Sequence, residues 1–497
     1  MIDINSLRPD KGGNIQAVKD SQRKRGGDKA VALVDEVIEL DQDWIKARFQ
    51  ADEVNRKINS IGKELQALAK AKQRDTPEWT ALQTRKAEAE AEKIEANKIS
   101  DEKEKILNHK LNLIGNIVHD SVVDSKDERD NLVVKKWWPE GRTEAAEMEK
   151  RNKLGGKDAK GVVGLYSHHE VLERIAGYDS QRGTNVAGHR GYFLTGPGVD
   201  LNLALIHYGL DFLEKRGYTK LWTPYFMKKS LMAKTAQLEE FDEALYKVGG
   251  EEASTDAAEE DRDEKYLIAT SEQPISAFHA GEWFTEPEKE LPKKYAGQST
   301  CFRKEAGAHG RDTWGIFRVH QFEKVEQFVL TEPEKSWDMH EEMIAIAQEF
   351  YQSLGLPYHV ISIVSGALNN AAAKKYDLEA WFPFQNEYKE LVSCSNCTDY
   401  QTRLLEIRLG AKKLNDQTKK YVHALNCTLT ATERTICCLL ENYQTEDGVV
   451  VPQVLRQYMG GKEFFPFVRE LPGGKKQGKP AKSTADALAK DVKKLAV

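Results

Sequence analysis

Proline is missing from two long consecutive stretches near the start of the chain, and this constrains the fold more than any other feature. None occurs between Pro9 and Pro77 or between Pro77 and Pro139, and the intervening sequence is rich in Ala, Glu, Lys, Leu and Ile. Such residues favour helix, whereas an interior proline breaks one. The segment AKQRDTPEW around Pro77 is typical of a turn followed by a helix start. The sequence therefore predicts two long helices that run antiparallel.

Each predicted helix carries apolar residues along one side. In the first they follow at steps of three and four residues, and in the second they recur every seven. The first series is Val54, Ile58, Ile61, Leu65 and Leu68, and the second joins Leu82, Ala89 and Ala96 to Ile99, Ile106 and Leu113. Two such seams predict a coiled-coil hairpin with arms of about 35 to 40 residues, on the order of 55 Å long. Arms of that length are expected to project from the rest of the protein.

Basic side chains outnumber acidic ones in the first arm, between Trp44 and Thr76. They are Lys46, Arg48, Arg56, Lys57, Lys63, Lys70, Lys72 and Arg74, against Asp52, Glu53, Glu64 and Asp75. Two interpretations are open. The charges can belong to the solvated outer face of an ordinary coiled coil. They can also form a face that binds phosphates.

The residue pattern changes after residue 118 to short strand-like runs with aromatic residues and turn residues. We expect an N-terminal helical domain over residues 1–118 and a globular α+β domain over residues 119–470. Within the second, an acidic segment at about 249–264 is interpreted as a surface insertion. Residues 471–497 form a Lys-rich tail with little to bury, and we expect it to be disordered.

The net charge of −6 indicates no global affinity for nucleic acid, so any such surface must be local. The N-terminus has no apolar run of signal-peptide length, and no window is long and apolar enough for a membrane span. A soluble cytoplasmic protein is expected, with no membrane partner. The six cysteines include one CxxC, Cys394 and Cys397, without a clear second pair. Buried thiols are favoured, and no zinc is expected.

Charged residues occur inside two strand-like runs, CFRKE at residue 301 and FRVHQFEKVEQF at residue 317. Period-two alternation puts Arg303 with Glu305 on one face of the first run. On the second it puts Arg318, His320, Phe322, Lys324, Glu326 and Phe328 together, opposite Val319, Val325 and Val329. Cross-strand ion pairs would explain the charges but not the aromatic residues among them. A ligand-binding face with an aromatic platform is the favoured interpretation.

Several segments in order along the chain resemble the class II aminoacyl-tRNA synthetases, in the form found in the seryl-tRNA synthetases. FRKE with FRVHQFEKVE resembles motif 2, GYTKLWTPYFM around Pro224 resembles motif 1, and LNCTLTATERTICCLLENYQ around Arg434 resembles motif 3. The runs TSEQP at Thr270 and ELVSCSNCTDYQ at Glu390 also resemble sites of this family. The resemblance covers essentially residues 1 to 470, including the helical arm.

The resemblance implies an α+β fold, with a class II antiparallel sheet flanked by helices and an N-terminal helical hairpin. It implies a serine–tRNA ligase that activates L-serine with ATP to seryl-adenylate and transfers the seryl group to the 3′ end of serine tRNA. A selenocysteine tRNA is an open second substrate. No side-chain nucleophile is implied, because the serine carboxylate attacks the α-phosphorus and the protein positions reactants and stabilises charge. A catalytically silent RNA-binding paralog is the alternative.

For ATP, the resemblance gives the α-phosphate to Arg303, the adenine end to Glu305 and the γ-phosphate to Arg434, three residues taken together as the catalytic set. Phe322 is expected to stack on the adenine. The full predicted ATP site is Arg303, Lys304, Glu305, Val319, His320, Gln321, Phe322, Glu390, Leu391, Val392, Ser393 and Arg434. Glu390 and Ser393 are the candidate Mg²⁺ ligands, since this ion prefers hard oxygen donors. For Glu390, a structural ion pair is the alternative.

For serine, the resemblance places Thr270 and Glu272 near the amino group and Glu326 near the side-chain hydroxyl. The predicted serine site is Thr270, Ser271, Glu272, Arg303, Glu326, Asn426 and Thr428. A carboxylate that accepts the hydroxyl hydrogen bond is left desolvated and unpaired by alanine, which gives strong rejection of that amino acid.

A homodimer is implied by the resemblance around Pro224, although a turn proline is the plain alternative. The helical hairpin is expected to grip the elbow and long variable arm of serine tRNA by shape and backbone charge. Leu404 stands where many relatives have an Arg. Cys427, Leu429 and Thr432 replace glycines common in bacterial relatives, which resembles a eukaryotic cytosolic form. For Arg318, the only expectation is a position on the phosphate side of the ATP site.

Overall fold

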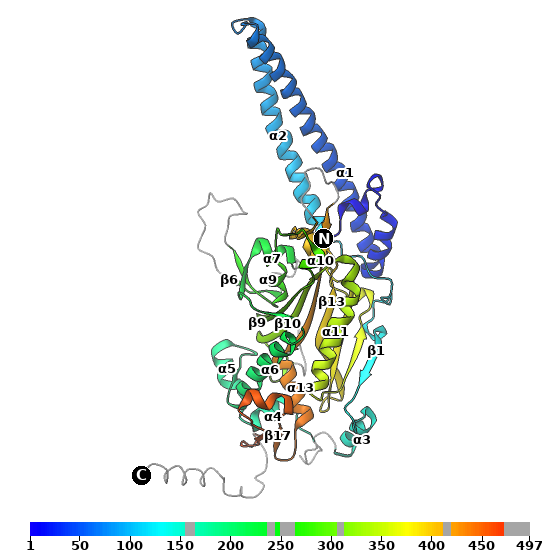
Figure 1. Cartoon of the computed structure of the whole chain (residues 1–497), viewed down its shortest axis with the longest axis vertical. Coiled ribbons are helices and arrows are strands. Elements are labelled where there is room, and N and C mark those ends of the chain that lie inside the picture. The colour runs from blue at the N-terminus through cyan, green and yellow to red at the C-terminus, as the bar shows by residue number, and fades with distance from the viewer. Residues whose placement is uncertain (155–164, 236–243, 249–263, 306–312, 411–418, 472–497) are drawn as a thin grey trace, which may run out of the picture.

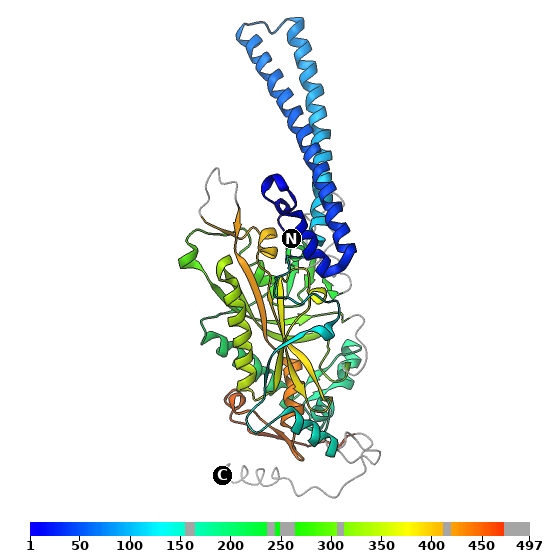
Figure 2. The same ribbon diagram turned by 90° about the vertical axis from the view of Figure 1, so that its right-hand side faces the viewer.

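The computed structural model describes residues 1–154, 165–235, 244–248, 264–305, 313–410 and 419–471. A long two-helix arm projects from one end of an elongated body, and the two perpendicular views agree on this (Figures 1 and 2). The predicted acidic insertion before Glu264 and the tail beyond Leu471 lie outside the described residues. Within the described part, no helix is both long enough and apolar enough to cross a membrane.

The arm consists of α1 (Ile15–Lys70) and α2 (Pro77–Leu113). At its tip, Thr76 caps α2 by accepting a hydrogen bond from the backbone N–H of Trp79, and Pro77 occupies the first helical turn. The predicted seam of α1 is confirmed, with Ile61 buried and its neighbours half-buried against Leu82 and Ala89 of α2. The helical hairpin is therefore as predicted, although α1 is longer than expected.

The second half of the α2 seam was predicted in the wrong register. Ile99 and Ile106 are 41% and 52% exposed, whereas Ser100 and Leu107 are buried. A heptad seam alternates steps of three and four residues. Here the buried position follows Ala96 by four residues, at Ser100, and recurs seven residues later, at Leu107. Each lies one residue after the predicted isoleucine. The two isoleucines thus lie on the outer surface of the arm.

The base of the arm is fixed to the body through buried polar contacts. The Arg25 guanidinium donates to the carbonyl oxygens of Asn116 at 2.8 Å and Asn369 at 3.1 Å, and also to that of Ala372. Burial lowers the pKa of Arg25 to about 10. Two residues later, Gly27 has φ 64° and kinks α1, a conformation that favours glycine.

The body is built on one eight-stranded sheet, antiparallel except where β4 pairs with β9. In spatial order its strands are β1 (Leu132–Trp137), β11 (Tyr358–Ser362), β12 (Lys374–Phe382), β13 (Glu387–Asn396), β16 (His423–Ala431), β10 (Gln321–Thr331), β9 (Lys293–Phe302) and β4 (Thr219–Trp222). The predicted α+β class with an antiparallel sheet is confirmed.

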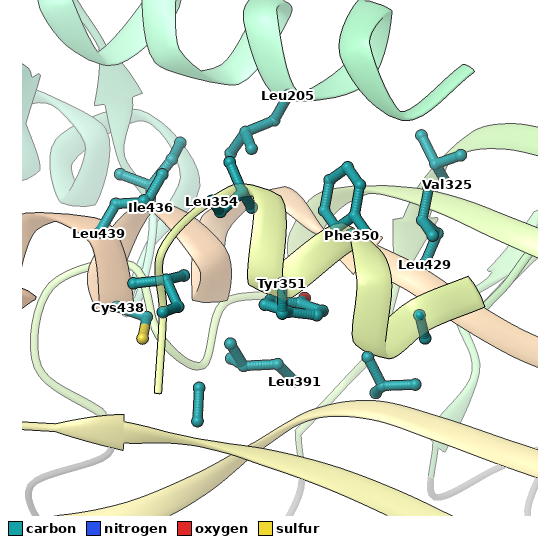
Figure 3. Packing of buried hydrophobic residues seen from close by; sticks show 14 of the residues in the cluster. Leu205, Val325, Phe350, Tyr351, Leu354, Leu391, Leu429, Ile436, Cys438 and Leu439 are labelled. Carbon is teal, nitrogen blue, oxygen red and sulfur yellow. The ribbon is translucent and has the colours of Figure 1, made fainter. Parts of the chain in front are cut away.

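Helices α6 (Pro197–Glu214), α11 (Ser336–Ser353) and α13 (Thr432–Tyr443) bury the main core against this sheet. Figure 3 shows Leu205 of α6, Phe350 and Tyr351 of α11, and Ile436 of α13 meeting above Leu391 of β13. A second, smaller apolar cluster contains Tyr295 of β9 and Phe328 and Leu330 of β10.

Shorter elements surround the sheet. The helices are α3 (Glu144–Leu154), α4 (His168–Arg174), α5 (Ser180–Ala187), α7 (Lys229–Thr235), α9 (Glu272–Ser276), α10 (Pro287–Glu290), α12 (Tyr400–Leu404) and α14 (Gln453–Arg456). The strands are β2 (Tyr178–Asp179), β3 (Phe193–Leu194), β5 (Phe226–Lys228), β6 (Lys247–Val248), β7 (Lys265–Leu267), β8 (Trp283–Phe284), β14 (Arg408–Leu409), β15 (Lys420–Tyr421), β17 (Gly448–Val450) and β18 (Phe464–Pro466). All six cysteines are buried thiols, as predicted.

Candidate active site

Strands β9 and β10 confirm the predicted hairpin, but its ends differ from the expectation. β9 ends at Phe302 and β10 begins at Gln321, so the charged segments around Arg303 and His320 flank the strands. Glu305 has φ 49°, a left-handed conformation that cannot continue a strand. The Arg303 backbone N–H donates to the His320 carbonyl at 2.9 Å. The two charged segments therefore stay side by side at the end of the hairpin.

Alternation along β10 separates Val325 from Phe322 and Lys324 as predicted, but Val319, expected opposite Phe322, precedes the strand and lines the same cavity. Val325 is buried in the main core, and Phe322 lines a cavity on the other side. Phe328 was expected on the polar face, but it is 1% exposed and packs in a second apolar cluster with Ile275 and Tyr295. Phe328 is therefore a core residue and no part of a ligand platform.

A cavity opens beside the hairpin end. Its walls come from β10, β13, β16, α13 and the segments flanking the hairpin. The predicted site residues that line it are Arg303, Glu305, Val319, Phe322, Glu390, Leu391, Thr428 and Arg434. The structure thus brings together residues from motifs that lie more than a hundred positions apart in the chain.

A buried carboxylate, that of Glu326, forms one end of this region. It is 2% exposed, accepts hydrogen bonds from Thr270 Oγ1 at 2.7 Å and Thr428 Oγ1 at 3.1 Å, and forms an ion pair with Lys324. Burial would raise the pKa of Glu326, but the Lys324 ammonium and the two hydroxyls outweigh it and hold the pKa below its ordinary value. An ionised acceptor is therefore available here.

A second carboxylate, that of Glu272, lies near the first. Its Oε1 accepts a hydrogen bond from Gln401 Nε2 at 3.0 Å. Burial, reinforced by the charge of Glu326, raises the pKa of Glu272 to about 7. Within the described part of the chain, no ion pair joins Glu272 to a cation as Lys324 is joined to Glu326, so a bound cation would favour its ionised form.

The other end of the region pairs a cation with a carboxylate. Arg434 Nη1 lies 3.6 Å from Glu390 Oε2, donates to the Glu390 carbonyl at 3.1 Å, and its guanidinium lies 5.0 Å from the Phe317 ring centroid. The Glu390 side chain is 48% exposed, and Arg434, helped by Lys375, Arg303 and Lys324, offsets the effect of desolvation and lowers its pKa. The guanidinium of Arg303 lies over the Phe322 ring at 5.2 Å.

Some predicted site residues are not brought to the cavity by their side chains. Ser271 is fully buried with Oγ 3.4 Å from the Gly297 carbonyl, and Val392 lies in the main core. Asn426 is half-buried beside Cys397. His320 and Gln321 line a neighbouring cavity, Lys304 is held through its backbone by Ala244, and Ser393 pairs with Asp377 across β13 and β12.

Arg318 and Leu404 take different places. Arg318 lines the cavity with its Nη1 3.7 Å from Glu305 Oε2. Leu404 lines another cavity, which also contains Thr270 and Glu272. Leu404 is thus an apolar wall near the Glu272 end of the region.

Four residues that contribute to this region were not assigned a role from the sequence: Lys324, Gln401, Tyr192 and Glu433. Lys324 was already on the polar face by alternation, and Glu433 precedes Arg434 directly. Gln401 and Tyr192 reach the region from distant segments, so only the tertiary fold reveals their contacts. Among the described residues, no group of three or more His, Cys, Asp or Glu side chains could hold a metal ion.

Two family models match the chain. One is described as "Seryl-tRNA synthetase N-terminal domain" and matches residues 1–118. The other is "tRNA synthetase class II core domain (G, H, P, S and T)" and matches residues 246–443.

Curated proteins and solved structures are similar over nearly the whole chain. The cytoplasmic serine–tRNA ligase of Schizosaccharomyces pombe is 58% identical, covering 95% of this chain and 98% of that protein. The Saccharomyces cerevisiae protein of the same name is 54% identical, covering 97% and 99%. A cytoplasmic serine–tRNA ligase from Naegleria fowleri, solved with AMP, has 48% identity and a TM-score of 0.77, covering 94% and 99%. A seryl-tRNA synthetase from Pyrococcus horikoshii, solved with ATP, has 38% identity and a TM-score of 0.78, covering 94% and 100%.

Proposed function

The chain belongs to the seryl-tRNA synthetases and is a serine–tRNA ligase, and we propose that its cavity holds serine at the Glu326 end and ATP at the Arg434 end. The enzyme uses ATP to form seryl-adenylate and then esterifies serine tRNA. The observation that carries the assignment of the two ends is the pair of carboxylates, Glu272 and Glu326, next to Arg303.

Serine recognition is proposed to divide between the two carboxylates. Glu326 is ionised and already accepts two hydroxyl hydrogen bonds, so it is suited to accept a third from the serine side chain. Glu272, with Thr270, is suited to bind the ammonium group, because a cation favours its charged form. Thr428 and Asn426 close the proposed pocket. Ser271, whose side chain is buried, is proposed to contribute to the serine pocket through its backbone.

ATP is proposed to stack its adenine on Phe322 and to extend toward Arg434. Arg303 lies over Phe322 and also influences the pKa of both Glu272 and Glu390, which supports a position between serine and triphosphate. There its planar guanidinium can hold the α-phosphate and the serine carboxylate. The serine carboxylate then attacks the α-phosphorus and pyrophosphate leaves. Arg434 binds the γ-phosphate, and Glu305 holds the adenine end.

The donor chemistry at the phosphate end fits Mg²⁺. Glu390 is an oxygen donor in the cavity wall, whereas the predicted second donor, Ser393, pairs with Asp377 and does not line the cavity. One carboxylate suffices, because Mg²⁺ commonly binds one or two carboxylates together with substrate phosphates rather than an all-protein cage. When bound, the ion would neutralise charge on the phosphates. Glu390 already faces Arg434, so this carboxylate also orients the guanidinium that is proposed to bind the γ-phosphate.

The arm is proposed to bind the elbow and long variable arm of serine tRNA. Its outer surface carries exposed basic side chains, including Arg48, Lys63 and Lys70. It also carries exposed apolar residues, including Phe49 and Ile94. Both suit contact with backbone and shape rather than with single bases. We propose residues 1–118 as the tRNA-binding domain and residues 119–470 as the catalytic domain. The selenocysteine tRNA is a candidate second substrate on the same arm.

A homodimer and a cytoplasmic location are further parts of the proposal. Trp222 on the edge strand β4 is 72% exposed, and Leu203 of the neighbouring α6 is 47% exposed. Large apolar residues exposed around motif 1 favour a partner subunit. The relatives named above as cytoplasmic support the location.

Exchange of pyrophosphate into ATP tests the activation step. Purified protein is expected to catalyse this exchange with serine, and with alanine or threonine far less well. Aminoacylation of serine tRNA, with a selenocysteine tRNA in parallel, then tests transfer. Absence of exchange with every amino acid, together with retained tRNA binding, would favour the catalytically silent RNA-binding alternative.

A further inference from the structure

A buried Tyr–Glu pair lies behind the proposed adenine site and has no part in the reaction described above. Glu433, in the first turn of α13, is 2% exposed. Its Oε1 lies 2.9 Å from the hydroxyl oxygen of Tyr192, and its Oε2 accepts hydrogen bonds from the Glu323 backbone N–H at 2.9 Å and from Thr432 Oγ1 at 3.0 Å. The pair joins the segment before β3 to β10 and α13.

A count of protons indicates the state of this carboxyl group. The Tyr192 hydroxyl oxygen lies 3.0 Å from the Gln321 carbonyl and 2.9 Å from Glu433 Oε1, but the hydroxyl has one proton to donate. If that proton goes to the carbonyl, the second contact is a hydrogen bond only when Glu433 carries a proton on Oε1 and donates it to Tyr192. In that state both contacts of the Tyr192 hydroxyl have one donor and one acceptor.

The pair holds the backbone on both sides of Phe322. Tyr192 binds the carbonyl of Gln321, the residue before Phe322, and Glu433 binds the N–H of Glu323, the residue after it. Arg434 follows Glu433 directly on α13. Phe322 and Glu433 both line the proposed ATP cavity and its neighbour, so this contact forms part of the wall between them.

The titratable groups that act directly on Glu433 are Tyr192, before β3, and Glu323 on β10. The ATP cavity that Glu433 lines also contains Arg303, Glu305, Arg318, Lys324, Glu390 and Arg434, and the neighbouring cavity contains Arg190, Tyr246 and His320. Burial raises the pKa of Glu433 to about 7, and the charge of Glu323 adds to this. Burial also raises the pKa of Tyr192 well above its ordinary range, so the tyrosine keeps its proton.

We propose that Glu433 acts as a neutral carboxylic acid which, together with Tyr192, positions Phe322, the proposed adenine-stacking ring, relative to Arg434, the residue proposed to bind the γ-phosphate. The inference rests on the ATP site proposed above. A neutral acid adds no negative charge beside the triphosphate, and its proton lets Tyr192 keep its bond to the Gln321 carbonyl. If Glu433 were ionised, the Tyr192 hydroxyl would donate its hydrogen bond to Glu433 instead. The Gln321 carbonyl would then lose its hydrogen bond from Tyr192.

The test compares Glu433→Gln with Glu433→Ala and Tyr192→Phe in serine-dependent pyrophosphate exchange by the full-length protein. A glutamine amide can donate to Tyr192 and accept from Glu323, so it reproduces the neutral acid but not the anion. We expect the KM for ATP to rise about tenfold in Glu433→Ala and several-fold in Tyr192→Phe, as loss of one buried hydrogen bond predicts, with the KM for serine nearly constant. Glu433→Gln is expected to stay within about twofold of wild type at about pH 6.5.

A pH profile separates positioning from general stability. In wild type, the KM for ATP is expected to rise as the pH increases from about 6 to about 8.5 and Glu433 loses its proton, while Glu433→Gln lacks this rise. Tyr443→Phe is the matched control, because it removes a tyrosine hydroxyl bound to the Leu354 carbonyl at the far end of α13. It is expected to leave both KM values unchanged.

Two results would overturn the inference: a Glu433→Gln variant as impaired as Glu433→Ala, or the same pH-dependent rise in wild type and Glu433→Gln. The first result would mean that the neutral form of Glu433 does not suffice. The second would mean that the loss of its proton does not cause the rise in the KM for ATP. Absence of exchange by wild-type protein would instead overturn the proposed function, so the two failures are distinguishable.

Discussion

Replacement of Glu326 by glutamine gives the sharpest test of how the enzyme selects serine. The substitution keeps the size of the side chain and removes its charge. Glu326 now accepts bonds from Thr270 and Thr428 and pairs with Lys324, and all three donors surround the place proposed for the serine hydroxyl. Glutamine has one acceptor oxygen instead of two, so the substrate hydroxyl must compete with the protein's own donors.

The expected magnitude follows from these contacts. A hydrogen bond to a charged acceptor contributes about 1.5 to 3 kcal/mol, which corresponds to roughly 10- to 150-fold in kcat/KM for serine. Alanine makes no such bond, so its kcat/KM is expected to change little, and the preference for serine over alanine should fall by about the same factor. Unfolding is also affected, because breaking a buried ion pair destabilises by about 3 to 5 kcal/mol.

Serine- and alanine-dependent pyrophosphate exchange, each at varied ATP concentration, measures both constants. Glu441→Gln is the matched control. Glu441 is a buried carboxyl group, 1% exposed, which pairs with His168 away from the cavity. The control is expected to lower the melting temperature without changing the ratio of serine to alanine. If Glu326→Gln raised the KM for ATP as much as that for serine, or left the ratio intact, Glu326 would not recognise the hydroxyl.

Three further outcomes are expected. Since the pKa of Glu272 is raised to about 7, its ionised form is lost as the pH falls, so the KM for serine should rise between about pH 8 and about pH 6, and Glu272→Gln should abolish that dependence while weakening serine binding throughout. Replacing residues 51–97 by a short linker keeps the base of the arm and should spare pyrophosphate exchange but abolish charging of tRNA; undiminished charging would exclude the arm as the tRNA element. Trp222→Asp with Leu203→Asp should give a monomer by sedimentation, and an unchanged mass would place any dimer interface elsewhere.

The helical arm shows what a periodic pattern can and cannot predict. Steps of three and four residues from Val54 to Leu68 fixed both the helix and its buried side. In α2, Ile99 and Ile106 have the composition of a seam, yet Ser100 is buried in their place. A heptad permits a second buried position three or four residues after the first, and the partner helix decides between them. That choice is a tertiary property.

The site shows a similar division. Alternation along β10 correctly predicts that Phe322, Lys324 and Glu326 share one face, because strand geometry is local. The end of the strands was mispredicted, since the left-handed turn at Glu305 has no sequence signal of its own. Contacts from Gln401 and Tyr192 depend on segments more than a hundred residues from their partners, and only the packed sheet brings them close.

Two neighbouring carboxylates have opposite pKa shifts, and their other contacts explain why. Glu326 forms an ion pair with a fixed cation, Lys324, and therefore stays ionised despite burial. Glu272 has an amide partner instead, and the charge of Glu326 raises its pKa further. Among the described residues, Glu272 therefore has no cation in direct contact, although Lys324 and Arg303 lower its pKa from further away. In the proposed site, the serine ammonium would supply a cation to Glu272 and the serine hydroxyl would donate to Glu326, so serine is expected to fit better than an amino acid without the hydroxyl.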